Sequence, residues 1–451
     1  MTTKFVSRRN FMRISAGLVA AGAAKVTLLE PLRLEAAAAI PPSDTVRFAS
    51  IGTGVRGCEL LHASLLVPGL ECVEVCDLYD SRHLAGREAV KKEVPATRNY
   101  KEILDRKDVD AVVVAIPDHQ HRRIVEDACA AGKDVYCEKP MSHTVEDGFA
   151  IVEAARKGNR IVQVGSQRVS SIVYAKAKEI YESGKMGDVF FIEAHWDRNS
   201  MSGAWVYPIP PDASEQTIDW NAFLGDAPKR PFDAARFFRW RCFADYGEGL
   251  AGDLFVHLIS GIHFITSTNS VPLRAQSTGG LFRWKDGRDF PDLIDTFYDY
   301  PNFRTAIRCN LNNEGGEMIG FYGTKGTMVI SGSTLTYKPQ DTRPQPESYS
   351  IYGWPERMRE EYLADFQTKH PATPPLAATV EEEVETFVPP RGYSDVADHL
   401  AVFFNAVRTR QRTIENEEFG NNAAIGCHLA NHSYFHKTVA TWDAGSKRIK
   451  G

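Results

Sequence analysis

Several features that point to other classes of protein are missing from this sequence of 451 residues. Its eight cysteines form no Cys-x-x-Cys pair, which argues against a thiol redox motif or a cysteine-rich metal site. After the first few residues there is no block dense in lysine and arginine, and the net charge is -5, so nucleic acid is not an expected partner. The sequence has no internal repeat, which argues against a solenoid or propeller.

The start of the chain resembles a twin-arginine export signal. Arg8 and Arg9 precede Asn10-Phe11, an uncharged stretch over 14–24 and a run of alanines at 36–39, near which cleavage is expected. A frayed basic tail would not explain this order. The apolar run is shorter than the ~20 residues that span a bilayer, so no stable membrane anchor is expected once the signal is cleaved. We assign 1–44 to a signal and linker and predict export to the periplasm.

The remaining chain is too long for one ordinary domain. Short apolar runs alternate with amphipathic helical patterns, which is typical of an α/β fold with a doubly wound parallel sheet covered on both faces. The predicted domain covers 45–167, with strands at 46–51, 72–76, 111–116, 135–137 and 161–164.

Residues 168–392 have a different pattern, in which a helix at 172–183 is followed by alternating strands of an α+β domain with a mostly antiparallel sheet. Within it, 339–390 is rich in proline and charge and is predicted to be an extended excursion with one short helix near 356–366. The last part, 393–451, is predicted to be helical and to pack back on both domains. The strands are predicted at 189–196, 293–300, 305–311, 318–322, 327–330 and 334–337.

A Gly-x-Gly-x-x-Gly loop joins the first strand to the first helix. Its glycines allow a tight turn and a close approach to a pyrophosphate, while the helix N-terminus offers free N–H groups. Asp77 ends the second strand twenty positions further on, where its carboxylate would bind ribose hydroxyls and favour NAD; Arg82 leaves NADP open. A bare glycine turn would not explain the matched acid. The loop residues are Gly52, Thr53, Gly54, Val55, Arg56 and Gly57.

The strand at 135–137 delivers Glu138, Lys139 and Pro140 to the carboxyl edge of the parallel sheet, where such folds bind ligands. Lys139 is expected to bind the ribose and the reacting hydroxyl, and its charge would stabilise a developing alkoxide. The alternative is a surface turn with a solvated lysine.

Asp253 and His257 lie four residues apart and share a face if their segment is helical. A histidine suits removal of a hydroxyl proton during hydride loss, and Asp253 would orient the substrate or raise the basicity of the imidazole. The alternative is a packed core histidine with a local hydrogen bond. His263 would project to another side and is predicted to be structural, and no metal site is expected.

Taken in order, the glycine-rich loop, Glu138-Lys139-Pro140 and Asp253-x-x-x-His257 resemble the glucose-fructose oxidoreductase, inositol dehydrogenase and rhizopine-catabolism family, called Gfo/Idh/MocA. The resemblance implies a Rossmann domain followed by an open-faced sheet that commonly forms a homo-oligomer interface. It makes Lys139, Asp253 and His257 the catalytic trio. It also places around the cofactor Ile116, Pro117, His121, Glu138, Lys139, Gln167 and Arg241.

The resemblance implies a sugar, glycoside or cyclitol that loses a hydride from a secondary hydroxyl. Because no free nicotinamide pool is expected outside the cytoplasm, an exported enzyme would hold its cofactor tightly. A second substrate could then restore the cofactor. Alternatively, one catalytic cycle could oxidise a sugar hydroxyl, eliminate the glycosidic bond, add water and reduce the ketone again, as in NAD-dependent N-acetylgalactosaminidases. The intact Glu138-Lys139-Pro140 favours net oxidoreduction. A binding protein without catalysis is the third alternative.

Overall fold

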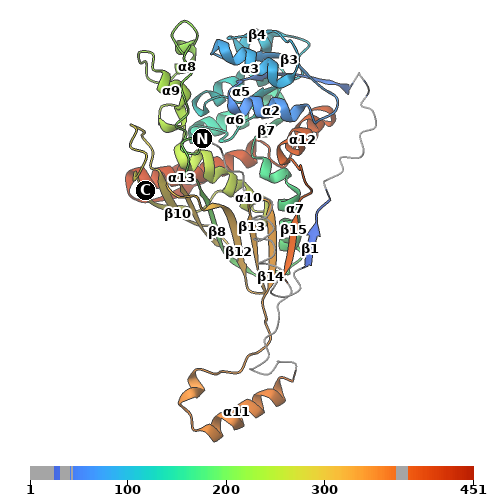
Figure 1. Ribbon diagram of the computed structural model, residues 1–451, viewed down its shortest axis with the longest axis vertical. Helices are drawn as coiled ribbons and strands as arrows, with labels where there is room; N and C mark the ends of the chain where they lie inside the picture. Colours follow the sequence, from blue (N-terminus) through green and yellow to red (C-terminus); the bar gives the residue numbers. More distant parts are fainter. Residues whose placement is uncertain (1–24, 31–40, 42–43, 372–383) are drawn as a thin grey trace, which may run out of the picture.

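A computed structural model describes residues 25–30, 41, 44–371 and 384–451 of the chain. The arginine pair, the apolar stretch and the alanine run of the predicted export signal lie outside these residues. Two sheets organise the described part, with the smaller one in the upper half of Figure 1 and the larger one below it. No helix of the described part is long and apolar enough to cross a membrane.

The smaller sheet has six strands in the order β4-β3-β2-β5-β6-β7, and every neighbouring pair is parallel. Its central strands, β2 and β5, are almost continuously buried and mostly apolar, as expected for a sheet covered on both faces. This confirms the predicted doubly wound α/β fold. The strands are β2 (Val46–Ile51), β3 (Leu70–Cys76), β4 (Ala96–Thr97), β5 (Ala111–Val114), β6 (Asp134–Cys137) and β7 (Val162–Val164).

Helices cover both faces of the parallel sheet. One face packs against α2 (Val55–Ser64) and α12 (Asp395–Thr409), with Phe48 and Phe404 in ring contact at 5.2 Å. The other face packs against α5 (His121–Ala130) and α6 (Val145–Gly158). The last part of the chain therefore contributes to the core of the first domain. Two further helices, α3 (Asp80–Val90) and α4 (Tyr100–Asp105), also contribute buried residues to the cores on these faces.

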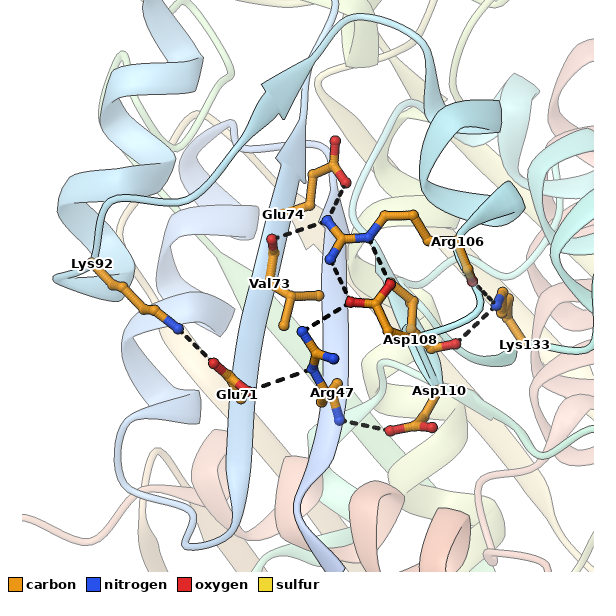
Figure 2. Close-up of polar contacts among 10 residues, drawn as sticks. Arg47, Glu71, Val73, Glu74, Lys92, Arg106, Asp108, Asp110 and Lys133 are labelled. Atoms are coloured by element: carbon orange, nitrogen blue, oxygen red, sulfur yellow. Dashed lines mark hydrogen bonds and ion pairs between the residues drawn. The ribbon is translucent and has the colours of Figure 1, made fainter. Parts of the chain in front are cut away.

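A network of charged side chains joins the loops at the amino edge of this sheet (Figure 2). Arg106 donates to both carboxylate oxygens of Asp108, at 3.0 and 2.7 Å, and to Glu74 at 2.7 Å. Arg47 approaches Asp108 from the other side, at 2.9 Å. Arg106 holds the pKa of Asp108 down to about 2. These contacts lie at the end of the sheet opposite to the ligand-binding edge, so we assign them to stability.

The larger sheet has eleven strands in the order β1-β15-β14-β13-β12-β8-β11-β10-β9-β16-β17, and most neighbours are antiparallel. The exceptions are β11 with β8 and β1 with β15. This confirms the predicted second domain. Six of its strands correspond to the strands predicted from the sequence: β8 (Val189–Asp197), β10 (Leu293–Asp299), β11 (Arg304–Asn310), β12 (Gly316–Gly323), β13 (Gly326–Ser331) and β14 (Thr334–Pro339).

One face of the larger sheet carries helices and the other is open. Along β10 and β11, buried residues such as Ile294 and Ile307 alternate with exposed ones such as Phe297 and Arg304. The buried set packs against α7 (Ile172–Glu182), α10 (Val256–Thr266) and α13 (Glu417–His436). Helix α13 crosses the middle of the molecule and also contacts α6 of the first domain (Figure 1).

The structure corrects two boundaries. Lys25–Leu28, within the predicted signal and linker at 1–44, forms β1, which pairs in parallel with β15 (Glu385–Val388). The sequence did not predict β1, because a strand of four residues is too short to show an alternating hydrophobic pattern next to the export motif. Cleavage near Ala39 would detach this strand. The final segment is not only helical, because β16 (Val439–Asp443) and β17 (Arg448–Lys450) extend the sheet next to β9 (Arg274–Gly280).

The excursion at 339–390 extends from the end of the larger sheet, and α11 lies well away from both sheets (Figure 1). The helix predicted at 356–366 is present as α11 (Glu356–Lys369), which has no buried residue. Tyr349 and Tyr352, just before it, are 91% and 79% exposed.

Candidate active site

The six strands of the parallel sheet end at one edge, and a residue predicted from sequence lies at or just after most of these ends. Gly52 follows β2, Asp77 follows β3, Glu138 follows β6 and Gln167 lies shortly after β7. The adjacent strands β2 and β5 belong to the two halves of the sheet, so their ends form the crevice where doubly wound folds bind ligands. A cavity of about 1090 Å³ opens there.

The glycine-rich loop is built for close packing at two of its three glycines. Gly52 has φ +95°, and a Cβ there would lie 2.2 Å from the carbonyl oxygen of Ala115. A Cβ on Gly57 would lie 2.0 Å from the carbonyl oxygen of Gly52. Gly54 lines the cavity and precedes α2 without a side-chain cap, which leaves N–H groups at the helix start for a phosphate. The loop therefore fits a dinucleotide.

Asp77 is held at the ribose end of the cavity by the backbone. Its Oδ2 accepts a hydrogen bond from the N–H of Thr53 at 2.9 Å, and its Oδ1 accepts one from Tyr79 at 3.0 Å. The guanidinium of Arg82 lies 3.6 Å from Oδ1 and packs over the ring of Phe237 at 5.4 Å. A 2′-phosphate would therefore lie beside a carboxylate, which favours NAD over NADP.

The other residues predicted around the cofactor differ in how they meet the cavity. Arg56 and Glu138 form an ion pair of 2.6 Å across its wall. Gln167 lines the cavity, and its Oε1 is buried with no hydrogen-bond partner in the described part of the chain, so it is available to a ligand. The further lining residues from the predicted set are Thr53, Val55, Ile116 and Pro117.

His121 does not line the cavity, contrary to the role implied by the resemblance. It is fully buried, with Nδ1 2.9 Å from the carbonyl oxygen of Pro140 and Nε2 3.0 Å from that of Ile116. Both ring nitrogens are therefore engaged by backbone. His121 therefore connects two loops at the sheet edge and fixes their position, and it does not line the cofactor cavity itself.

Lys139 and Asp253 connect the two domains across the cavity. The Lys139 ammonium donates to the backbone oxygen of Asp253 at 2.8 Å and to its Oδ1 at 3.0 Å. Arg241 donates to the same Oδ1 at 2.9 Å. Burial alone would raise the pKa of Asp253, but the charges of Lys139 and Arg241 hold that pKa well below its usual value. The carboxylate therefore stays ionised between two cations.

Asp253 and His257 lie at the junction of two helix types. Ala251–Phe255 forms a π-helical turn, and His257 is in the first turn of α10. Turns of this kind are frequent at functional sites. The hydrogen-bond partners of the Asp253 carboxylate are Lys139 and Arg241. Its negative charge also acts to raise the pKa of His257, as predicted, but burial and nearby cations lower that pKa by more.

His257 lines the cavity, and its ring nitrogen Nδ1 has no hydrogen-bond partner among the described residues. Burial, together with the positive charges of Lys139 and Arg168, holds the pKa of His257 well below its usual value. The imidazole is therefore neutral near pH 7 and has a free lone pair. His263 is fully buried in α10, 2.9 Å from the Tyr300 hydroxyl, which agrees with a structural role.

The sequence analysis missed a group of residues around Trp196 at the end of β8. The Trp196 ring contacts the His257 ring, with centroids 5.3 Å apart, and the guanidinium groups of Arg168 and Arg198, at 5.7 and 4.7 Å. Arg198 lines the cavity. An arginine or tryptophan next to a strand carries no motif, so only the fold brings these residues to the site.

Among the described residues, no group of three or more His, Cys, Asp or Glu side chains could hold a metal ion. The site instead combines a glycine-rich loop, a ribose-binding acid, a lysine and a neutral histidine along one cavity. Together with the fold, this defines a two-domain dinucleotide-binding protein with polar groups suited to proton transfer.

Comparison with known proteins finds a family model that resembles the first domain. Residues 46–166 match the Gfo/Idh/MocA model, described as an oxidoreductase family with an NAD-binding Rossmann fold. This part of the chain is therefore similar to the NAD-binding Rossmann domain of that family.

Two curated relatives are inositol dehydrogenases. Inositol 2-dehydrogenase of Salmonella paratyphi B is 29% identical over 160 residues, covering 35% of this chain and 48% of that protein. Inositol 2-dehydrogenase 1 of Saccharopolyspora erythraea is 35% identical over 148 residues, covering 32% and 43%. The matches thus span about half the length of these relatives.

Solved structures resemble almost the whole chain in fold. A levoglucosan dehydrogenase in complex with NADH and levoglucosan has a TM-score of 0.65 at 17% identity and covers 88% of this chain and 99% of that one. An aldose-aldose oxidoreductase from Caulobacter crescentus, complexed with glycerol, has a TM-score of 0.62 at 15% identity with the same coverage. These similarities establish the two-domain fold.

Proposed function

We propose that the protein is an NAD-dependent oxidoreductase that removes a hydride from a secondary hydroxyl of a sugar, glycoside or cyclitol. The observation that carries the proposal is the cavity itself, which runs from Gly54 and Asp77 to Lys139 and His257. A binding protein without catalysis would not need a buried neutral imidazole and an ammonium group at the same end of the site.

The mechanism follows from the two side chains. His257, which lines the cavity and is held neutral by burial and the nearby cations, accepts the proton of the substrate hydroxyl. Lys139 donates a hydrogen bond to that oxygen as negative charge develops on it, and Asp253 holds the ammonium in place. When bound, NAD supplies the hydride acceptor. Gln167 and the Gly54 loop would orient the cofactor through hydrogen bonds.

We further propose export to the periplasm with the cofactor tightly bound. The order of the twin-arginine pair, the apolar stretch and the alanine run supports export. A protein exported in the folded state can carry NAD with it. A second sugar substrate would then have to return the cofactor to its oxidised form.

The relatives support net oxidoreduction over glycoside hydrolysis. Those named above are dehydrogenases or an oxidoreductase that act on inositol, levoglucosan or aldoses according to their names. These substrates are polyols with secondary hydroxyls, and the class comes to this chain as a proposal.

One set of measurements tests the function. Purified protein is denatured and the released nucleotide is identified by mass spectrometry; we expect NAD. Intact protein is then incubated with free sugars and with aryl glycosides, and the near-ultraviolet absorbance of reduced nicotinamide is followed. Reduction by a free sugar supports the proposal. Release of phenol without any net change in the cofactor would contradict it.

We also propose that the protein forms a homo-oligomer through the open face of the larger sheet. Phe297 is 52% exposed in the middle of β10 on that face. Phe297→Asp should lower the molecular mass measured by light scattering after size exclusion. Leu84→Asp, at a 56% exposed position of α3, is the matched control and should leave the mass unchanged. A monomeric unmodified protein would reject the proposal.

A further inference from the structure

Arg198 is a cation in the cavity wall with no anionic partner. The second domain contributes two arginines to this wall, and Arg241 is paired with Asp253 at 2.9 Å. Within the described residues, the side chain of Arg198 forms no ion pair and no hydrogen bond. Its backbone N–H donates to the carbonyl oxygen of Asn310 at 2.9 Å, which fixes the residue at the end of β8. The guanidinium therefore forms no direct ion pair, although its charge acts at longer range to lower the pKa of Asp253 and of Glu317.

Arg198 lies at the proposed substrate end of the cavity. Its guanidinium carbon is 4.7 Å from the centre of the Trp196 ring, and the His257 ring is 5.3 Å from the same centre. The guanidinium and the imidazole can therefore be no further apart than these two distances combined. An upper limit of this size allows one sugar residue to contact both groups. Tyr207, which is only partly buried, lines the same cavity and offers aromatic surface for a sugar ring.

The carboxylates near this end are paired with other cations. Lys139 and Arg241 share the single carboxylate of Asp253. Arg168 pairs with Glu317 at 2.6 Å and with Asp395 at 3.0 Å. Arg198 therefore adds a positive charge that none of these carboxylates contacts directly.

A neutral sugar would leave this charge without compensation, whereas a carboxylate would form two parallel charge-assisted hydrogen bonds with a guanidinium. We infer that the substrate is an acidic sugar, whose carboxylate is bound by Arg198 while one of its ring hydroxyls lies at His257. The inference rests on the proposed function and narrows its substrate class from sugars in general to sugar acids.

The test compares a hexuronate with the neutral hexose of the same ring stereochemistry, for example glucuronate with glucose and galacturonate with galactose. Binding to the protein with its cofactor is measured by calorimetry, and reduction of the bound cofactor is followed separately. We expect at least one uronate to bind at least tenfold more tightly than its matched hexose.

Arg198→Met should lower this preference at least tenfold, since a hydrogen bond between charged groups is worth about 1.5–3 kcal/mol. Arg359→Met is the control, because Arg359 lies in α11 and packs over Tyr352 at 5.9 Å, far from the cavity. It should leave the preference unchanged. Circular dichroism confirms that each variant is folded.

The outcomes separate the two proposals. Equal binding of every uronate and its hexose, or equal weakening of both by Arg198→Met, would overturn the role of Arg198 even if sugars reduce the cofactor. Tight uronate binding that depends on Arg198, without cofactor reduction by any sugar, would support the site and contradict the proposed oxidoreduction.

Discussion

Lys139 and Asp253 lie 114 positions apart in the chain, yet the ammonium of one donates to two oxygens of the other, at 2.8 and 3.0 Å. Lys139 comes from the loop after β6 and Asp253 from the turn before α10, so the pair joins the two domains at the cavity. An ammonium anchored in this way is already oriented before a substrate arrives. Preorganised donors of this kind stabilise developing negative charge.

Lys139→Met should therefore lower kcat/KM for the substrate by about 10²–10³-fold, as is typical when a donor to a developing oxyanion is removed. Bound NAD, measured after denaturation, should persist because the glycine loop is untouched. Lys157→Met, at an exposed position of α6, is the control. Turnover by Lys139→Met at the unmodified rate would remove Lys139 from the mechanism.

The three glycines of the loop should respond differently to alanine. Gly54→Ala meets only the Arg82 guanidinium, at 3.4 Å, so the protein should fold, but its methyl group would stand where the pyrophosphate approaches the backbone. We expect loss of NAD with little change in Tm. Gly57→Ala would place a Cβ 2.0 Å from a backbone oxygen and should lower Tm as well. Full NAD occupancy in Gly54→Ala would contradict the position of the cofactor.

The neutral state of His257 makes a prediction about pH. Because burial and the nearby cations hold its pKa below the usual value, the imidazole should remain a base at pH values well below about 6.5. The acid limb of kcat/KM should then lie below pH 6.5. Arg168→Gln removes one of these positive charges, makes the imidazolium easier to form and should move the limb to higher pH. A limb above pH 6.5 in the unmodified protein would contradict this assignment.

Local patterns predicted the cofactor half of the site well. The loop over Gly52–Gly57 and the acid at Asp77 depend on a strand, a turn and a helix that adjoin in sequence, so the fingerprint contains most of the geometry. The alternation of apolar runs likewise predicted the parallel sheet. Here local structure and the global fold depend on the same residues.

The substrate half depends on contacts between distant residues, which no local pattern reports. The Lys139 partner of Asp253, and the position of Arg198 beside Trp196, result from packing of the second domain against the first. His121 was expected at the cofactor, but two backbone carbonyls engage its ring. Strand β1 is too short to show a pattern, and the residues of β15 with which it pairs lie at least 357 positions later in the sequence.

Buried neutral histidines should make the protein sensitive to acid. His399 is 1% exposed, with Nε2 2.8 Å from the Val164 carbonyl oxygen and Nδ1 2.7 Å from the Ser170 hydroxyl. Burial lowers its pKa to about 4, whereas histidine in the unfolded chain titrates near 6.5. As the pH falls from about 6.5 to 4, the unfolded state therefore takes up a proton that the folded state does not, and the free energy of unfolding decreases.

Between pH 7 and pH 5 this one residue should cost about 2 kcal/mol of stability. His399→Gln should have a lower Tm at pH 7, because it disturbs two buried contacts, but a smaller loss of Tm on going to pH 5 than the unmodified protein. Thermal unfolding at a series of pH values measures both. The exposed His62→Gln is the control and should follow the unmodified protein. Equal pH dependence in His399→Gln would mean that His399 has the same pKa in the folded and unfolded states, because only a group with different proton uptake in the two states can produce this slope.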